Sequence, residues 1–246
     1  MRNLFFIAVC LGMTFAATAA DYGKNGSNSM DMIQVKCFKD VDVCNQASLE
    51  KVFADIVPLD IACCNWQEQF PYVPQVKLRM FHTGSHLVLK YEVTEKCTAA
   101  KADGDNGRTW ADSCVEFFFQ KEGEDRYYNL ESTCIGNILM GWKSGRNDGL
   151  PATDEQLAAI GRFPSLGRKP FAERLGENSW SIILTVPASA FRYSGIESFS
   201  GLKGRFNAYK CGDELSTPHF LSLVPIDTPE PDFHRPEFFT EICFGN

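Results

Sequence analysis

The chain of 246 residues carries 24 lysines and arginines against 31 aspartates and glutamates, which gives a formal net charge of −7 at pH 7. Because the sequence also lacks a cluster of basic residues, nucleic acid and anionic membranes are poor partners for it. A chain of this length fits one all-β domain as easily as two smaller ones. No Ser/Gly-rich linker or internal repeat divides it, so a single domain is favoured.

The first twenty residues have the pattern of a secretory signal peptide. Arg2 supplies a positive charge, residues 4–15 are apolar, and a small-x-small cleavage signal ends at Ala19. The apolar stretch is shorter than the roughly 20 residues of a membrane span. We therefore predict a signal peptide at residues 1–20, an N-terminal arm at 21–45, and an exported, periplasmic or extracellular protein without membrane insertion.

The cysteine count bears on the redox state of the exported chain. Of the ten cysteines, Cys10 leaves with the signal peptide, so nine remain and at least one thiol is free or intermolecular. Cys37 and Cys44 are spaced to close a short loop. Three others lie in strand-like segments, where a buried free cysteine packs as a small hydrophobe: Cys114, Cys134 and Cys211.

Residues 46–246 have the pattern of a β-rich domain. A short helix is predicted from Ser48, which can cap its N-terminus, to about Asp55. Thereafter short segments alternate with period two between turn residues, as antiparallel strands do. The predicted strands are 75–82, 86–93, 115–120, 126–133, 138–143, 180–186, 205–211, 220–224 and 238–244.

These nine strands favour two antiparallel sheets packed face to face, an all-β, jelly-roll-like β-sandwich. We expect under about a fifth of the residues in helices. Residues 143–178 are rich in proline, glycine and charge, and they predict a long excursion at one end of the sandwich.

Polar side chains share one face of several predicted strands. Alternation puts Val115, Phe117 and Phe119 in the core and turns Glu116 away from it. The same test pairs polar residues on two further strands, Asn129 with Glu131 and Asn207 with Tyr209. With Trp110 at its rim, this polar face is either a binding surface or a solvated outer face with one structural tryptophan.

The C-terminal segment 205–244 interleaves polar groups with six phenylalanines. This combination suits a ligand with hydroxylated edges and apolar faces, which describes a sugar ring. The candidate residues are His219, Phe220, His234 and Arg235. The guanidinium of Arg235 offers a planar fork for hydroxyls or a carboxylate. Packing of the segment against the edge of the sandwich is the alternative explanation.

Three motifs carry a resemblance to a known family. They are W-x-D-S-x-V-E-F-F from Trp110, the Tyr-Tyr-Asn strand that follows it, and F-H-R-P-E-F-F from Phe233. Together they resemble the family 9 carbohydrate-binding modules, and more closely the exported single-domain relatives of glycan-using bacteria. The similarity begins at Asn65-Trp66 and covers nearly the whole mature chain. It implies a β-sandwich that clamps a sugar between two tryptophans and hydrogen-bonds its hydroxyls.

By position, the resemblance implies that Trp110 is the first clamp residue and Glu116 the glutamate that bonds the sugar. It also implies a further polar contact from the strand of Asn129 and Glu131. The second clamp tryptophan falls on Leu223, which departs from the family pattern. Phe220 or Phe233 would then have to supply the second face, and Leu223→Trp is expected to restore it.

The expected function is that of an exported, non-catalytic protein that binds a mono- or oligosaccharide. No cofactor and no metal is expected at the site, and a structural calcium ion is compatible with the fold. Two alternatives remain open. A glycoside hydrolase would use Glu116 and Glu131 as its carboxylate pair, about 5 to 10 Å apart. A structural or partner-binding sandwich would hold no small ligand.

Overall fold

The computed structural model describes residues 32–102 and 104–246. The predicted signal peptide and the first part of the predicted arm lie outside the described residues. The chain forms two packed β-sheets, with 44% of residues in strands and 12% in helices. The predicted β-sandwich with little helix is therefore confirmed. None of the described helices is long and apolar enough to cross a membrane.

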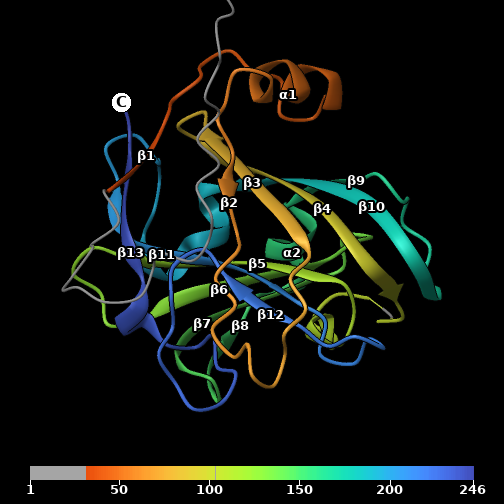
Figure 1. Cartoon of the computed structure of the whole chain (residues 1–246). Helices are drawn as coiled ribbons and strands as arrows, with labels where there is room; N and C mark the ends of the chain where they lie inside the picture. The colour runs from red at the N-terminus through yellow and green to blue at the C-terminus, as the bar shows by residue number, and fades with distance from the viewer. Residues whose placement is uncertain (1–31, 103) are drawn as a thin grey trace, which may run out of the picture.

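The larger sheet has eight strands in the order β1-β13-β11-β5-β6-β7-β8, with β12 paired to β11. Its strands are β1 (Ile33–Val35), β5 (Cys114–Lys121), β6 (Tyr127–Thr133), β7 (Ile138–Gly145), β8 (Asp148–Pro151), β11 (Lys203–Cys211), β12 (Phe220–Ser222) and β13 (Thr240–Phe244). The strand pairs described in this sheet are antiparallel except β1 with β13, which lie side by side in Figure 1.

The smaller sheet has five strands in the order β2-β3-β4-β10-β9. Its strands are β2 (Leu59–Asp60), β3 (Gln75–His82), β4 (His86–Ala100), β9 (Gly161–Pro164) and β10 (Phe171–Pro187). Figure 1 shows this sheet above the larger one, with helix α1 (Gln46–Phe53) at the top. The other helical segments are α2 (Asp154–Ala158) and three 3₁₀ turns at Thr109–Ala111, Ala188–Ser194 and Pro236–Phe238.

The main hydrophobic core lies between the two sheets. Val115, Phe117 and Phe119 of β5 face into it, as the period-two pattern predicts. Leu78 of β3 and Leu89 of β4 are fully buried in the same core. Residues 114, 116 and 118 must therefore point to the opposite face of the eight-stranded sheet.

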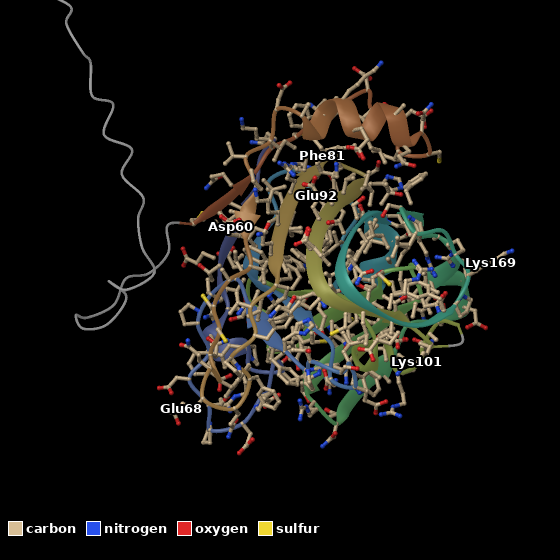
Figure 2. The ribbon with its side chains drawn as sticks, turned by 45° about the vertical axis from the view of Figure 1, so that its right-hand side comes forward. Asp60, Glu68, Phe81, Glu92, Lys101 and Lys169 are labelled. Carbon is tan, nitrogen blue, oxygen red and sulfur yellow. The ribbon has the colours of Figure 1, made fainter. Side chains whose placement is uncertain are left out.

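Helix α1 packs on the outer face of the smaller sheet. Its buried residues Leu49 and Phe53 join Phe81 in a separate apolar cluster, and Figure 2 shows Phe81 beneath the helix. The helix begins at Gln46, two residues before the predicted start. The cap is Asn45, whose side-chain oxygen accepts a hydrogen bond from the Ser48 backbone N–H at 3.2 Å.

Two predicted segments have more regular structure than expected. Residues 143–178 contain β8, α2, β9 and the first half of β10 rather than one irregular excursion. That half of β10 is largely exposed and pairs with the end of β4 through two register shifts, so its side chains show no apolar period. In the predicted arm, residues 33–35 form β1 and pair with residues 242–244 of β13.

Candidate functional site

A pocket of about 580 Å³ lies on the outer face of the eight-stranded sheet, opposite the core. Its floor comes from neighbouring strands, because Glu116 of β5, Glu131 of β6 and Leu139 of β7 stand in one cross-strand row. The pocket is lined by Trp110, Glu116, Asn129, Glu131, Leu139, Lys143, Arg146, Asn147, Cys211, Asp213, Phe220, Pro231, Phe233 and His234.

The polar floor is almost completely withdrawn from solvent. Glu116, Asn129 and Glu131 are 3%, 0% and 4% exposed. Glu131 accepts hydrogen bonds from the Thr109 hydroxyl at 2.7 Å and from the Asn129 amide at 2.9 Å. The amide oxygen of Asn129 has no hydrogen-bond partner among the described residues. A buried acceptor without a partner is costly, and a hydroxyl group in the pocket would satisfy it.

The carboxyl groups of the pocket are poor acids. Burial and the neighbouring Glu131 hold the pKa of Glu116 well above its usual value. Burial also raises the pKa of Glu131, against the opposing effect of its hydrogen bonds from Thr109 and Asn129. At the rim, burial raises the pKa of Asp213 to about 6. Burial therefore makes these carboxyl groups easier to protonate than in water, and their oxygens are acceptors for hydroxyl groups in the pocket.

Aromatic side chains form the walls. Trp110 lies in the 3₁₀ turn before β5, while Phe220 comes from β12 and Phe233 from the loop that follows it. The Phe233 ring stacks on Tyr209 with centroids 4.2 Å apart and an interplanar angle of 6°. The Tyr209 hydroxyl also donates to the Phe233 carbonyl at 3.1 Å. The stack holds Phe233 in place at the pocket wall.

Basic residues complete the rim. Lys143 donates to the Arg146 carbonyl at 2.8 Å, and the Arg146 guanidinium lies 3.6 Å from the Asp232 carboxylate. His234 Nδ1 lies 2.8 Å from the Tyr127 hydroxyl. Burial, followed by the charges of Lys143 and Arg146, lowers the pKa of His234 to about 3, so this ring is neutral at physiological pH.

Six of the ten candidate residues thus line one pocket, and four lie outside it. Asn207 is fully buried and fastens β11 to the segment after β12 through both the N–H and the carbonyl of Val224. Tyr209 is fully buried behind Phe233. Arg235 pairs with Glu237 at 2.6 Å instead of turning into the pocket.

His219 takes part in a buried ionic cluster inside the sandwich. The Lys210 ammonium lies 2.8 Å from the Glu95 carboxylate and 2.8 Å from His219 Nε2, and all three side chains are fully buried. Burial and the nearby Lys210 lower the pKa of His219 to about 3. Burial alone would raise the pKa of Glu95, but the Lys210 charge brings it below its usual value. His219 therefore stabilises the fold in this structure and does not reach the pocket.

Leu223 does not face the pocket either. It is 4% exposed and belongs to the main core between the sheets. The register pairs Ser222 with Tyr209 and Phe220 with Cys211, which places residues 220 and 222 on the pocket side. Alternation then turns residue 223 inward, so a tryptophan there would enter the core. The expectation that Leu223→Trp restores a second binding face is corrected accordingly.

Sequence reasoning overlooked the basic and acidic rim. The row Leu139, Gly141 and Lys143 faces the pocket beside Glu131 and Asn129, and strict period two from Leu139 would have indicated Lys143. Arg146 and Asp213 lie in turns that follow strands, where alternation gives no direction.

Solved structures of other proteins share this fold. The crystal structure of a proposed carbohydrate-binding protein from Bacteroides uniformis shares 39% sequence identity and superposes with a TM-score of 0.80, covering 86% of this chain and 99% of the other. A family 9 module from Caldicellulosiruptor kristjanssonii, solved in complex with cellotriose, is 10% identical. Its TM-score of 0.51, over 87% of this chain and 93% of the other, reflects the fold alone. No curated protein sequence matches the chain. The sequence profile of carbohydrate-binding family 9 matches residues 46–244, and the chain belongs to this family.

Proposed function

We propose that this chain is an exported, non-catalytic carbohydrate-binding protein that holds a mono- or oligosaccharide in the pocket on the eight-stranded sheet. The observation that carries the proposal is a pocket with aromatic walls and a buried polar floor, in which the Asn129 amide oxygen has no hydrogen-bond partner from the described part of the chain. A pyranose ring presents apolar faces to such walls and hydroxyls to such a floor. Membership of the family supports the same ligand class.

The arrangement of the two glutamates favours binding over hydrolysis. Glu116 and Glu131 are directly opposite each other on adjacent antiparallel strands, which places their Cβ atoms about 4.5–5.5 Å apart. Both side chains rise from one floor, so a sugar above them meets both from the same side. A glycosidase needs its two carboxyl groups to flank the scissile bond.

Export rests on the sequence pattern at residues 1–20. The acidic net charge supports a partner other than nucleic acid or an anionic membrane surface. We therefore place the binding event in the periplasm or outside the cell.

Isothermal titration against glucose, xylose, uronic acids and their oligosaccharides tests the proposal. We expect one site per chain, which Trp110→Ala removes. Trp142→Ala is the matched control, because Trp142 is half-buried and stacks on Tyr193 at 5.3 Å, away from the pocket lining. Equal affinities for wild type and both variants would rule out the pocket as the sugar site.

A separate assay addresses catalysis. The purified protein is incubated with a broad polysaccharide panel, and reducing sugar is measured over time. We expect no release above the level of a buffer blank. Release by wild type that disappears in Glu116→Gln would establish a hydrolase instead.

A further inference from the structure

At the pocket floor, two strands bring two cysteines and a glutamate together. Cys114 of β5 and Cys211 of β11 are direct cross-strand partners, and Glu116 lies two residues beyond Cys114 on the same face. One ligand atom from each of the three residues lies within 4.8 Å of the other two. The Cys211 thiol donates to Glu116 Oε1 at 3.1 Å.

We propose that Cys114, Cys211 and Glu116 form a binding site for a thiophilic divalent cation such as Zn²⁺, with one coordination position open to the pocket. Tetrahedral zinc with Zn–S bonds of about 2.3 Å and Zn–O bonds of about 2.0–2.2 Å requires neighbouring ligand atoms about 3.5–3.8 Å apart. The observed cluster meets this requirement with side-chain shifts below about 1 Å.

The cation has a route to the site and a fourth ligand. Cys211 and Glu116 both line the pocket, whereas Cys114 lies behind them. A water molecule from the pocket can complete the tetrahedron. Catalytic zinc sites likewise keep one position for an exchangeable ligand.

Another buried cysteine of this chain, Cys134, has a different environment from the Cys114–Cys211 pair. The thiol of Cys134 lies in the main core and donates to the Ala99 carbonyl at 3.6 Å. The Cys114–Cys211 pair lies on the opposite face of the sheet, where the two residues are cross-strand partners and the Cys211 thiol donates to the Glu116 carboxyl. Two soft ligands and one hard ligand converge there on strands fixed by the sheet, which preorganises them.

Metal binding releases protons to the buffer and leaves a net negative charge at the site. Each thiol that coordinates loses its proton to the buffer, and so does Glu116 if protonated. Two thiolates and one carboxylate carry three negative charges, so the divalent cation leaves a net charge of −1. The basic rim residues Lys143 and Arg146 line the same pocket and offset this charge. The proposal shares a pocket with sugar binding, but its test needs no sugar.

The test is a titration of the reduced full chain with Cd²⁺, followed by the ultraviolet charge-transfer band between thiolate and cadmium. We expect wild type to bind one more equivalent than Cys114→Ser or Cys211→Ser. Cys243→Ser is the control, since Cys243 is a half-buried cysteine of β13 outside the cluster. Circular dichroism verifies that each variant is folded.

Two further measurements keep the test independent of the serine variants. Glu116→Gln keeps both thiols, and it should retain the band while the affinity falls at least about tenfold. Zinc-edge absorption of the wild-type complex should show two sulfur neighbours at about 2.3 Å and lighter atoms at about 2.0–2.2 Å.

The proposal is overturned if wild type gains no equivalent over the two serine variants, or if zinc has no sulfur neighbours. It is also overturned if mass spectrometry of the native protein shows a Cys114–Cys211 disulfide, because the thiols are then already bonded. None of these outcomes alters the sugar titration of wild type and Trp110→Ala, so the failure of one proposal is distinguishable from the failure of the other.

Discussion

Phe233→Leu tests whether a flat aromatic wall binds the sugar. The ring of Phe233 is 7% exposed, stacks on Tyr209 from behind, and lines the pocket in front. Leucine fills a similar volume without a π-face. The substitution should therefore remove ring stacking on the ligand while largely preserving the apolar cluster around Trp66 and Phe220.

The two expected effects differ in size. Replacement of one buried apolar side chain by another of similar volume costs less than about 1.5 kcal/mol of stability. Loss of a stacked aromatic face costs about 1–3 kcal/mol of binding free energy, by analogy with base stacking on aromatic side chains. That range corresponds to an affinity about 5- to 150-fold weaker. Chemical denaturation measures the first effect and isothermal titration the second.

Phe239→Leu is the matched control. Phe239 is 4% exposed in the same apolar cluster and packs edge-on against Tyr127 at 5.6 Å, but it does not line the pocket. It should lose comparable stability and keep its sugar affinity. If both variants bind sugar as tightly as wild type, or if both weaken equally, Phe233 does not act as a binding face.

Three further perturbations have defined outcomes. In Gly141→Ala, the added Cβ would lie 3.1 Å from the Asn129 amide oxygen and 3.3 Å from the Leu150 carbonyl oxygen; titration should show weaker sugar binding and thermal melts a small loss of stability, because both neighbours must shift to relieve these close contacts. Lys210→Met leaves the Glu95 carboxylate buried without its cation and should cost about 3–5 kcal/mol in urea unfolding, much of which a second change, Glu95→Gln, should restore. Because the folded pKa of His219 is lowered to about 3, its contribution to stability is present above pH 6.5 and is lost as pH falls. His219 alone should account for about 2 kcal/mol of the stability lost between pH 7 and pH 5, and His234, whose pKa is also lowered to about 3, for a similar share. His219→Gln should therefore remove about 2 kcal/mol of that loss, and an unchanged pH slope in that variant would contradict the assignment.

The strands that were predictable from sequence are those with one face in the core. β3 was predicted at its observed bounds, and the inward row of β5 followed directly from alternation. The first half of β10 was not predicted as a strand, because it extends beyond the sandwich and neither of its faces is covered by the core. The three-residue pairing of β1 with β13 joins opposite ends of the chain, and such short parallel contacts leave no local pattern.

The site was predictable to a similar degree and for the same reason. Glu116, Asn129 and Glu131 lie on regular strands, so period two fixed the side of the sheet that they occupy. His219 and Arg235 lie outside strands, and a linear sequence reveals neither the hydrogen bond of His219 with Lys210 nor the ion pair of Arg235 with Glu237.

The resemblance to the family placed a binding residue at Leu223, and a pair of substitutions separates that assignment from the observed geometry. Leu223 faces the core, so Leu223→Trp overpacks it and should cost about 1–3 kcal/mol of stability with no gain in sugar affinity. Phe220→Trp instead enlarges an aromatic face that already lines the pocket, and it should tighten sugar binding. Thermal melts and titrations of both variants measure these effects. Tighter binding by Leu223→Trp, with stability unchanged, would mean that residue 223 turns toward the ligand and that its inward orientation directly after β12 is incorrect.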